Sequence, residues 1–571
     1  MNPDRTSAAE SSSDVTEAPS RTVPSPFAGS PAANSAVWAA YGDALGWISE
    51  LTDQTGLRRR VGTDALRDLV PWKRRVGGRG GVNFALPRGC YSDDTQLRLA
   101  VGRCCGPDGF DVEAFSRVEL PVWTAYALGG GNSTKSAATS MARPGARWSA
   151  NFVDGYGNAG GNGAAMRVQP HAWAPRRPTD ALLRDVIRDA VVTHGHPRGI
   201  LGACLHALSI ADLMPSGEGT LRALGVKSFR GFVSSLSSIF VVMAEDDELA
   251  AFWLPAWEDA ERQSWENAAS ATLAELDADL RIAAEVFEAC DSPDQGYRDL
   301  VTALDLRSDN HRGSGTRTVV AALLVTCLMR RFDLEPLDAV LLVVNELGTD
   351  TDSIASMLGA YIGLLHTRVP KSPPLDWELI AGEAKRIENG LPANMPYPDL
   401  LTWEPPRTQG DALVLDEAAR MVVVGLGPVT EESETLWNPR GDFGWVQVRT
   451  SFQQTLIIKR RKELPALGGG KATDSVKDVL SSPAPGTPRQ NVTSADVNRE
   501  HETLFSTTAP DHEPTSAEVL EASMQLVRSR KFSSAAIGDV LKTLTRQHGP
   551  GVAAAFGALV SDELSRSTRR K

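Results

Sequence analysis

The sequence predicts an all-α fold for the main part of this 571-residue chain, followed by a small β-containing appendage and a C-terminal helical bundle. Between residues 34 and 407, apolar residues recur at steps of three and four, which is the spacing of amphipathic helices. Residues 411–464 instead combine β-branched residues with partial alternation, as strands do. Helical spacing returns in three runs within residues 514–571. One hydrophobic core rarely organises so long a chain, so several domains are expected.

The segments around these domains are predicted to lack fixed structure. Residues 1–33 are rich in Ser, Ala and Pro and carry acidic residues where a signal peptide needs a basic start and an apolar centre. Residues 465–513 are rich in Gly, Ser, Thr and Pro, a composition typical of linkers. Two Gly-rich stretches inside the helical domain, residues 75–90 and 127–167, are predicted to be long loops of the kind that serve a functional site.

Composition argues against several classes of protein. Lys and Arg number 59 and Asp and Glu number 71, and the resulting formal charge of −12 opposes non-specific attraction to nucleic acid or anionic membranes. The longest apolar run, Thr318 to Met329, is too short to span a bilayer and is interpreted as a core helix. The six cysteines show no CxxC pairing, which indicates neither a disulfide framework nor a zinc ribbon. A reducing, cytoplasmic location is therefore expected.

Two short acidic motifs, YSDDTQ at residues 91–96 and GTDTDS at residues 348–353, suggest chemistry. Each places carboxylates beside a small hydroxyl residue where a helix is predicted to begin. Oxygen ligands without sulfur or histidine favour Mg²⁺ or Mn²⁺ over zinc. If the two motifs met, their charges would repel unless divalent cations neutralised them. The alternative is that these residues simply cap helix N-termini, as Asp and Ser often do.

The helix after the second motif is predicted to be buried. Its apolar residues fall on one face, and Gly359 and Gly363 would let a neighbouring element approach closely.

Two further motifs lie between the acidic ones. GNGAAMR, at residues 161–167, suits close backbone approach to a diphosphate, with Arg167 adding charge, although a Gly-rich turn is often only a turn. THGHP supplies His194 and His196, which lack the additional His or Cys neighbours that a metal site needs. Hydrogen bonding to a sugar hydroxyl and a plain loop remain the two interpretations of these histidines.

The order of the motifs is more specific than any one of them. Near the N-terminus, GDALGWISE places Asp43 and Glu50 on either side of Gly46, where without context both would be solvated or capping acids. Along the chain follow GDALG at 42–46, SDDT at 92–95, GNGAAMR at 161–167, TH at 193–194, and DTDS at 350–353 followed by IASMLGAYIG. This order resembles the ADP-ribosylglycohydrolase family, also called ADP-ribosyl-acceptor hydrolases, over about residues 34–370.

The resemblance implies an all-α catalytic domain with two divalent cations, Mg²⁺ or else Mn²⁺, in a cleft that binds ADP-ribose. Carried over by position, the metal ligands would be Ser92, Asp93, Asp94, Asp350, Asp352 and Ser353. The substrate-binding residues would be Gly161, Asn162, Gly163 and His194. Either Glu50 or Asp94 would transfer the proton, and the sequence does not choose between them.

This chain departs from the family pattern in its second acidic motif. The family usually has GGDTDT there, whereas this chain has Thr349 in place of the second glycine and Ser353 in place of the final threonine. Ser353 keeps the hydroxyl ligand. Thr349 puts the loop geometry in doubt if that position requires a positive φ, which β-branched residues resist.

The function implied is metal-assisted hydrolysis of the glycosidic bond between ADP-ribose and an acceptor. The alternatives are a non-catalytic ADP-ribose-binding module that recruits a partner, and an unrelated helical hydrolase or phosphatase. The expected partner is an ADP-ribosylated protein or other acceptor, and the C-terminal region could recruit a further protein. The identity of the acceptor is left open, and the loop of residues 132–148, with Lys135, Arg143 and Arg147, is where acceptor contacts are expected.

Overall fold

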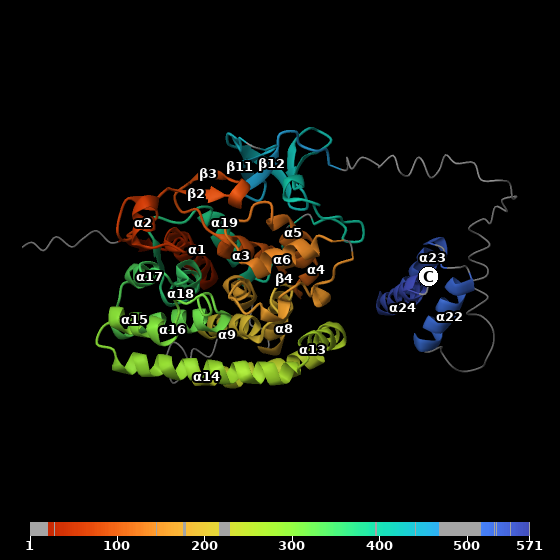
Figure 1. Ribbon diagram of the computed structural model, residues 1–571, viewed down its shortest axis with the longest axis horizontal. Coiled ribbons are helices and arrows are strands. Elements are labelled where there is room, and N and C mark those ends of the chain that lie inside the picture. Colours follow the sequence, from red (N-terminus) through yellow and green to blue (C-terminus); the bar gives the residue numbers. More distant parts are fainter. Residues whose placement is uncertain are drawn as a thin grey trace, which may run out of the picture. The chain divides into compact units, whose positions relative to one another are not determined.

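The computed structural model forms two compact units, residues 1–471 and 472–571 (Figure 1). The structure describes residues 21–467 and 516–569, apart from residues 28, 144, 175–178, 216–228, 394, 396, 440, 530–531, 533 and 549.

Two antiparallel helices, α1 (Pro31–Ser49) and α18 (Thr351–Leu365), form the centre of the first unit. Glycines let their backbones touch: a Cβ atom at Gly42 would lie 2.1 Å from a carbonyl oxygen of α18, and one at Gly359 would lie 2.2 Å from a carbonyl oxygen of α1. The predicted close approach is confirmed, and the pairing places the end of α1 beside the start of α18. The four glycines at this contact are Gly42, Gly46, Gly359 and Gly363.

The other helices of this unit surround the central pair, with the long helix α14 (Trp265–Ala289) along one side (Figure 1). They are α2 (Gln54–Val61), α3 (Asp93–Arg103), α4 (Val112–Ala114), α5 (Leu120–Trp123), α6 (Asn132–Met141), α7 (Gln169–Trp173), α8 (Thr179–Val191), α9 (Pro197–Leu213), α11 (Phe229–Leu236), α12 (Ile239–Glu245), α13 (Leu254–Glu261), α15 (Pro293–Ala303), α16 (Gly315–Arg331), α17 (Pro336–Val344) and α19 (Trp377–Glu388).

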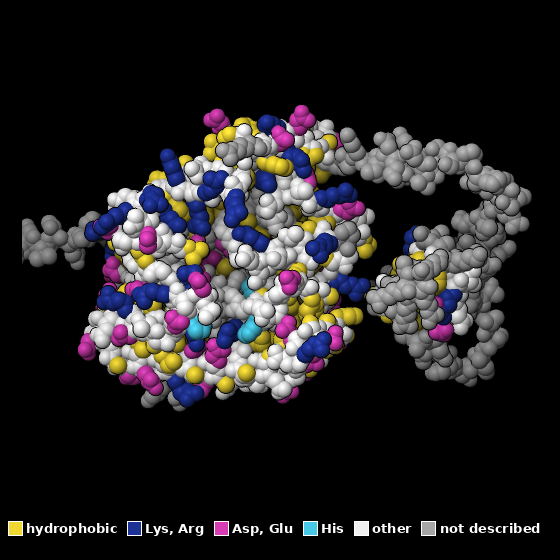
Figure 2. All heavy atoms as spheres, viewed as in Figure 1, with side chains coloured by type: hydrophobic (Ala, Val, Ile, Leu, Met, Phe, Trp, Pro, Cys, Tyr) yellow, Lys and Arg dark blue, Asp and Glu magenta, His cyan; other side chains and the backbone are white. Residues whose placement is uncertain are grey.

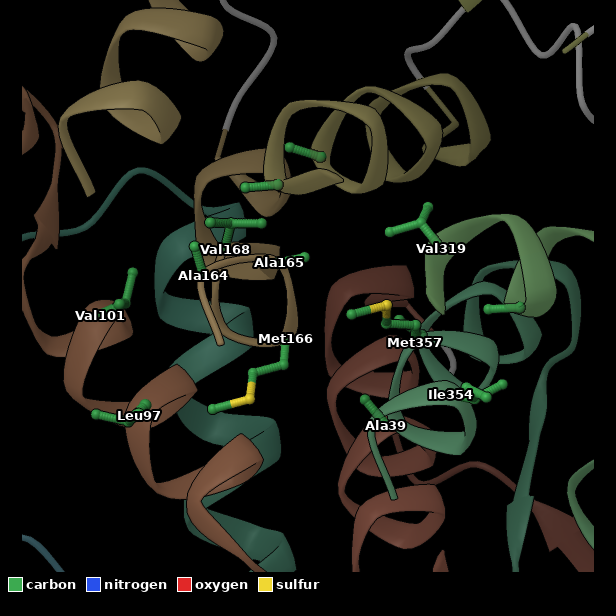
Figure 3. Close-up of a cluster of buried hydrophobic side chains, with 14 of the residues drawn as sticks. Ala39, Leu97, Val101, Ala164, Ala165, Met166, Val168, Val319, Ile354 and Met357 are labelled. Carbon is green, nitrogen blue, oxygen red and sulfur yellow. The ribbon is translucent and has the colours of Figure 1, made fainter. Parts of the chain in front are cut away.

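Apolar side chains fill the space between these helices and hold the site-bearing segments together. Figure 3 shows Leu97 on α3, Met166 on the short turn at residues 165–167, and Met357 on α18 within one buried cluster. All three are almost fully buried. Burial of this kind stabilises by roughly 1.5–3 kcal/mol for each large apolar side chain. The core therefore fixes the starts of α3 and α18 relative to each other.

The helical domain also contains short strands, so it is mostly helical rather than all-α. The Gly-rich stretch at residues 75–90, predicted to be a loop, belongs largely to a hairpin of β2 (Trp72–Val76) and β3 (Val82–Leu86). Strand β1 (Thr22–Pro24) pairs with β6 (Arg368–Pro370), and β4 (Cys105–Gly106) pairs with β5 (Gly109–Phe110).

The end of the N-terminal segment differs from the sequence expectation. Residues 1–33 are expected to be disordered, yet β1 and the first turn of α1 lie within this range. Residues 1–20 lie outside the described residues.

A six-stranded antiparallel sheet follows the helices, where the sequence predicts β structure. Its strands are β7 (Leu413–Leu415), β8 (Met421–Val423), β9 (Gly427–Glu432), β10 (Leu436–Trp437), β11 (Phe443–Thr450) and β12 (Thr455–Arg461). The sheet is bonded to the helical domain, because Lys459 N donates to Ala125 O at 2.9 Å and Arg103 donates to Gln454 Oε1 at 2.8 Å. The predicted appendage is thus packed onto the helical domain.

The second unit contains three helices, in the region where the sequence predicts a three-helix bundle. They are α22 (Ser516–Ser529), α23 (Ser534–His548) and α24 (Pro550–Arg569), packed around buried residues such as Val527, Leu544 and Phe556. Nearly all of the predicted linker, from residue 468 on, lies outside the described residues.

Across the described helices, none has both the length and the apolar character needed to span a bilayer. All six cysteines are buried free thiols.

Candidate functional site

The first acidic motif forms the N-terminus of α3. Ser92 is the N-cap, and its Oγ accepts a hydrogen bond from Asp94 N at 3.2 Å. Asp93 and Asp94 follow in the first turn, and both are buried. Oxygen Oδ1 of Asp94 has no hydrogen-bond partner among the described residues. Because a buried carboxylate oxygen without a partner is costly, Asp94 is a strong candidate for contact with a ligand.

A buried carboxylate from α1 holds this motif in place. Asp43 Oδ1 accepts from Ser92 N at 3.0 Å, and Asp43 Oδ2 accepts from Thr95 N at 2.9 Å. Burial raises the pKa of Asp43, and the hydrogen bonds from Thr95 and Ser92 counteract this effect. Asp43 therefore caps a helix other than its own, namely α3, which begins 50 residues further along the chain. The signal that could have indicated it is an acid within the apolar sequence of α1.

The second acidic motif begins α18, where its N-cap residue does not cap. The side chain of Asp350 bonds to none of the backbone N–H groups of the described helix α18. Its Oδ2 instead accepts from Asn162 Nδ2 at 3.0 Å. Gly313, at φ +74°, leaves room for this carboxylate, since a Cβ atom there would lie 2.8 Å from Asp350 Oδ2. The capping alternative therefore does not account for Asp350.

The loop before this motif tolerates Thr349 without strain. The positive φ, +89°, belongs to Gly348, whereas Thr349 has a negative φ. The Thr349 hydroxyl donates to Glu346 O at 2.8 Å. Position 349 therefore does not require a positive φ, and a threonine fits the loop geometry there.

The two acidic motifs meet. Ser353 Oγ donates to Asp94 Oδ2 at 3.4 Å, although these residues are 259 positions apart. Burial, and then the charges of Asp43, Asp93 and Asp350, raises the pKa of Asp94 well above its usual value. Like charges are thus concentrated in a buried site, which is unfavourable unless cations compensate them.

The other acids of the cluster respond in the same way. Burial raises the pKa of Asp93 to about 7, with further contributions from Glu50 and Asp43. Burial also raises the pKa of Asp352 well above its usual value, followed by the effects of Glu50, Asp350 and Asp94. Over the described part of the chain, however, no three His, Cys, Asp or Glu side chains are arranged as a group that could hold a metal ion. One oxygen of Asp352, Oδ1, is instead used within the protein, where it accepts a hydrogen bond from Ser353 N at 3.0 Å.

Glu50 lies at the end of α1, next to this cluster, and is paired with an arginine. Its side chain is 20% exposed, and Arg74 of β2 approaches to 3.4 Å. The Arg74 guanidinium lies 4.8 Å from the ring centroid of Trp47. Burial raises the pKa of Glu50, and the nearby Arg74 counteracts this. Sequence reasoning missed Arg74, because it lies in a hairpin far from any motif; the basic run at residues 73–75 is the only sign of it.

The GNGAAMR motif joins the site through Asn162. Asn162 N donates to Gly313 O at 2.8 Å, and Nδ2 also donates to Thr318 Oγ1 at 3.1 Å. These bonds hold the Gly161–Gly163 turn against the start of α16 and beside Asp350. The structure thus brings this turn next to the second acidic motif.

His194 lies next to this turn as a neutral imidazole. A Cβ atom at Gly163 would lie 3.2 Å from His194 Nε2. Burial, and then the nearby charge of Arg167, lowers the pKa of His194 to about 3. Thr193 Oγ1 accepts from Arg167 at 2.9 Å and lies 2.7 Å from His194 Nδ1. Thr193 thus links His194 to Arg167 through its hydroxyl, and the other ring nitrogen, Nε2, faces the glycine turn.

Arg167 does not contribute charge to a ligand. It is fully buried, and it donates to Asp189 Oδ1 at 2.9 Å and to Gly163 O at 2.9 Å. Its role is to hold the glycine turn in shape, so the prediction of a diphosphate contact is wrong for this side chain.

The predicted acceptor loop is partly helical, since residues 132–141 form α6. Lys135 of this helix lies near the first acidic motif, where its charge lowers the pKa of Asp93 against the effect of burial. In the space-filling view, the face of the molecule is hollowed near its middle, with Lys and Arg side chains above the hollow and His side chains below it (Figure 2).

Comparison with known proteins identifies the helical domain. The family model of the ADP-ribosylglycohydrolases matches residues 35–386. The chain belongs to the ADP-ribosylglycohydrolase family. The family resemblance seen in the sequence is thereby confirmed.

Among similar proteins, this ADP-ribosylglycohydrolase-family chain resembles YegU of Escherichia coli (strain K12), which is described as uncharacterized. The two are 25% identical over 351 residues, which are 60% of this chain and 89% of YegU. A solved structure of an ADP-ribosylglycohydrolase-related protein complex matches with 17% identity and a TM-score of 0.37, covering 64% of this chain and 98% of that one.

Proposed function

We propose that this protein is a metal-dependent hydrolase that cleaves the glycosidic bond between ADP-ribose and an acceptor. The observation that carries the proposal is the meeting of the two acidic motifs, marked by the Ser353–Asp94 hydrogen bond. Clustered buried carboxylates and the unpartnered Asp94 Oδ1 both destabilise the folded protein. We infer that they are kept because they bind a ligand there. Family membership supports ADP-ribosyl chemistry as that function.

The donor chemistry of the site suits two divalent cations. The available atoms are carboxylate and hydroxyl oxygens, which Mg²⁺ and Mn²⁺ prefer. When bound, such ions would supply Lewis acidity and would compensate the clustered negative charge. The residues proposed to hold them are Ser92, Asp93, Asp94, Asp350, Asp352 and Ser353.

The protein's own groups would bind and orient ADP-ribose. We assign the glycine turn, Gly161, Asn162 and Gly163, to the diphosphate and the adjoining ribose, because glycines permit close backbone approach. His194 would form a hydrogen bond to a sugar hydroxyl through Nε2, because its lowered pKa keeps it neutral and a hydroxyl can pair with either form of a neutral imidazole nitrogen.

The proton-transfer group is proposed to be Glu50 or Asp94. Each has a raised pKa because of burial, which brings a carboxyl closer to the pH range where it can both gain and lose a proton. The substitutions Glu50→Gln and Asp94→Asn separate them. A residue that only transfers the proton leaves Mg²⁺ affinity unchanged in calorimetry, whereas a residue that also holds metal weakens it.

The decisive test replaces Asp352. Asp352→Ala should lower the release of ADP-ribose by about three orders of magnitude or more, because bound metal contributes several kcal/mol to the transition state. The melting temperature should change little, since a capping role would be worth only about 1 kcal/mol. The matched control is Asp338→Ala, an acid in the first turn of α17 whose side chain is 46% exposed, which should leave release unchanged.

The assay uses a panel of ADP-ribosylated substrates with different linkages, with Mg²⁺ and with chelator. Turnover by Asp352→Ala at the wild-type rate would reject the metal role. Tight ADP-ribose binding by the wild type without release from any substrate would favour the binding module. Hydrolysis of phosphomonoesters alone would favour an unrelated hydrolase.

A further inference from the structure

The C-terminal sheet touches the tip of the β2–β3 hairpin. Gly77, at φ +85°, lies against the indole of Trp445, so closely that a Cβ atom at Gly77 would come within 2.0 Å of the ring. Asn438 Nδ2, from the loop after β10, donates to Gly80 O in the same tip. Figure 1 shows β2 and β3 lying beside β11. The hairpin tip is therefore supported from outside the helical domain.

The hairpin carries Arg74 to Glu50. Arg74 lies in the middle of β2, opposite Phe84 of β3. Its guanidinium lies 4.8 Å from the ring centroid of Trp47 and 5.8 Å from that of Trp72, and reaches Glu50 at 3.4 Å. Cation–π contacts and a long ion pair hold Arg74 loosely, so its place depends on where β2 runs.

A two-stranded hairpin is marginally stable alone and needs packing to hold a fixed position. The sheet can supply it, because the sheet is anchored separately to the helical domain. Asp376, just before α19, accepts from Thr455 N at 2.7 Å and from Thr455 Oγ1 at 2.8 Å. The same carboxylate accepts from the hydroxyl of Tyr91, the first residue of the first acidic motif, at 2.9 Å.

We propose that the C-terminal sheet, through Trp445 and the β2–β3 hairpin, sets the position of Arg74 against Glu50, so that Trp445 is a positioning residue for the candidate site. The proposal rests on the hydrolase function proposed above. It assigns a role to residues 411–461, which lie beyond the part of the chain that the family model matches. The sheet then belongs to the catalytic unit.

The test compares Trp445→Ala with Trp445→Phe in the full chain. In Trp445→Ala, hydrogen exchange of the β2 and β3 amides should accelerate at least about tenfold, because the tip loses its support. The value of kcat should fall about 10- to 100-fold, the usual cost of a small misplacement near the chemistry. Trp445→Phe, which keeps a ring against Gly77, should restore both to within about threefold of wild type.

A double-mutant cycle tests the route through Arg74. If Trp445 acts through Arg74, then Trp445→Ala should lower kcat by less than about twofold when Arg74→Ala is already present. The matched control is Phe452→Ala, which removes an aromatic ring from the turn after the far end of β11, where the Arg103 guanidinium lies over it. It should leave hairpin exchange and kcat unchanged even if it lowers the melting temperature.

The outcomes separate this proposal from the function it rests on. Unchanged hairpin exchange in Trp445→Ala, or losses of kcat that are additive with Arg74→Ala, would overturn the positioning role. A wild-type protein without hydrolase activity would refute the proposed function, while the exchange measurement would still report whether the sheet supports the hairpin.

Discussion

The two acidic motifs open their helices in different ways. In the first, Ser92 and Asp43 satisfy the backbone N–H groups at the start of α3, so capping is done by neighbours of the acids. In the second, Asp350 occupies the N-cap position of α18 but turns its carboxylate to Asn162. The difference shows that an acid at a helix start is free for ligand chemistry when another group caps or when the cap is left open.

The supports behind the two helices differ as well. The first turn of α3 is held at its start by Asp43 and Ser92, whereas α18 is held along its length by glycine contacts with α1 and by a hydrogen bond to a histidine. His206 Nδ1, on α9, lies 2.7 Å from the hydroxyl of Tyr361 on α18. The first motif should therefore depend on a few contacts at the helix start, two of them from Asp43, whereas the second should depend on contacts spread along its helix.

Among the substitutions that probe this comparison, replacing Asp43 should have the largest effect on stability, because it removes two of the hydrogen bonds that hold the start of α3. An amide in Asp43→Asn has one oxygen for two N–H donors, so one buried donor faces an NH₂ group. The free energy of unfolding should fall by about 1–3 kcal/mol. Hydrolase activity should fall about 10- to 100-fold, since Asp93 and Asp94 lose their orientation. Urea unfolding and ADP-ribose release measure the two effects.

The control for this variant is Asp53→Asn, which alters a capping carboxylate that is exposed. Asp53 caps α2 by accepting from Gly56 N at 2.7 Å. Asn caps as well as Asp does, so stability should change by less than about 0.5 kcal/mol. Equal losses in the two variants would show that Asp43 is an ordinary cap.

Sequence patterns predicted the parts of this protein that depend on local chemistry. Periodicity predicted the buried helix after Ser353, and its glycines predicted that a neighbouring element approaches closely, because each property depends on residues within a few turns. That the neighbour is α1 came from the structure. The resemblance predicted the family. The site residues of the two acidic motifs and the glycine turn lie close together, while their roles remain predictions.

Long-range contacts could not be predicted in the same way. Asp43 caps a helix that begins at Asp93, and Arg74 reaches Glu50 only because a hairpin folds over the end of α1. For Arg167 the sequence predicted a role that the structure does not support. Its charge suggested a ligand contact, whereas Asp189 pairs with it in the core. A single sequence records residue types, and burial by distant segments decides what those residues do.

The histidine support of α18 should make this helix sensitive to acid. Burial, and then the charge of Arg98, lowers the pKa of His206 to about 3, below its unfolded value of about 6.5. Between these values the unfolded chain binds the proton and the folded chain does not, so stability falls as pH falls. The wild type should lose up to about 1.4 kcal/mol per pH unit below pH 6.5 from this group.

The measurement is the difference in unfolding free energy between wild type and His206→Gln from pH 7 to pH 5. Taking the difference removes the opposite trend from the buried acids, whose raised pKa values favour folding at low pH. The variant should be the less stable protein at pH 7, and the gap should narrow as pH falls. A gap that stays constant would mean that His206 does not titrate in this range.

The smallest effect is expected at the loop before the second motif. Thr349→Gly, which restores the residue usual in the family, should lower the free energy of unfolding by about 1 kcal/mol, because Thr349 has a negative φ and glycine only adds freedom to the unfolded chain. Activity should stay unchanged.

The companion variant Gly348→Ala should lower the free energy of unfolding by about 1–2 kcal/mol, because Gly348 holds the positive φ. Stabilisation by Thr349→Gly would instead place the strained position at residue 349 and would count against this loop geometry.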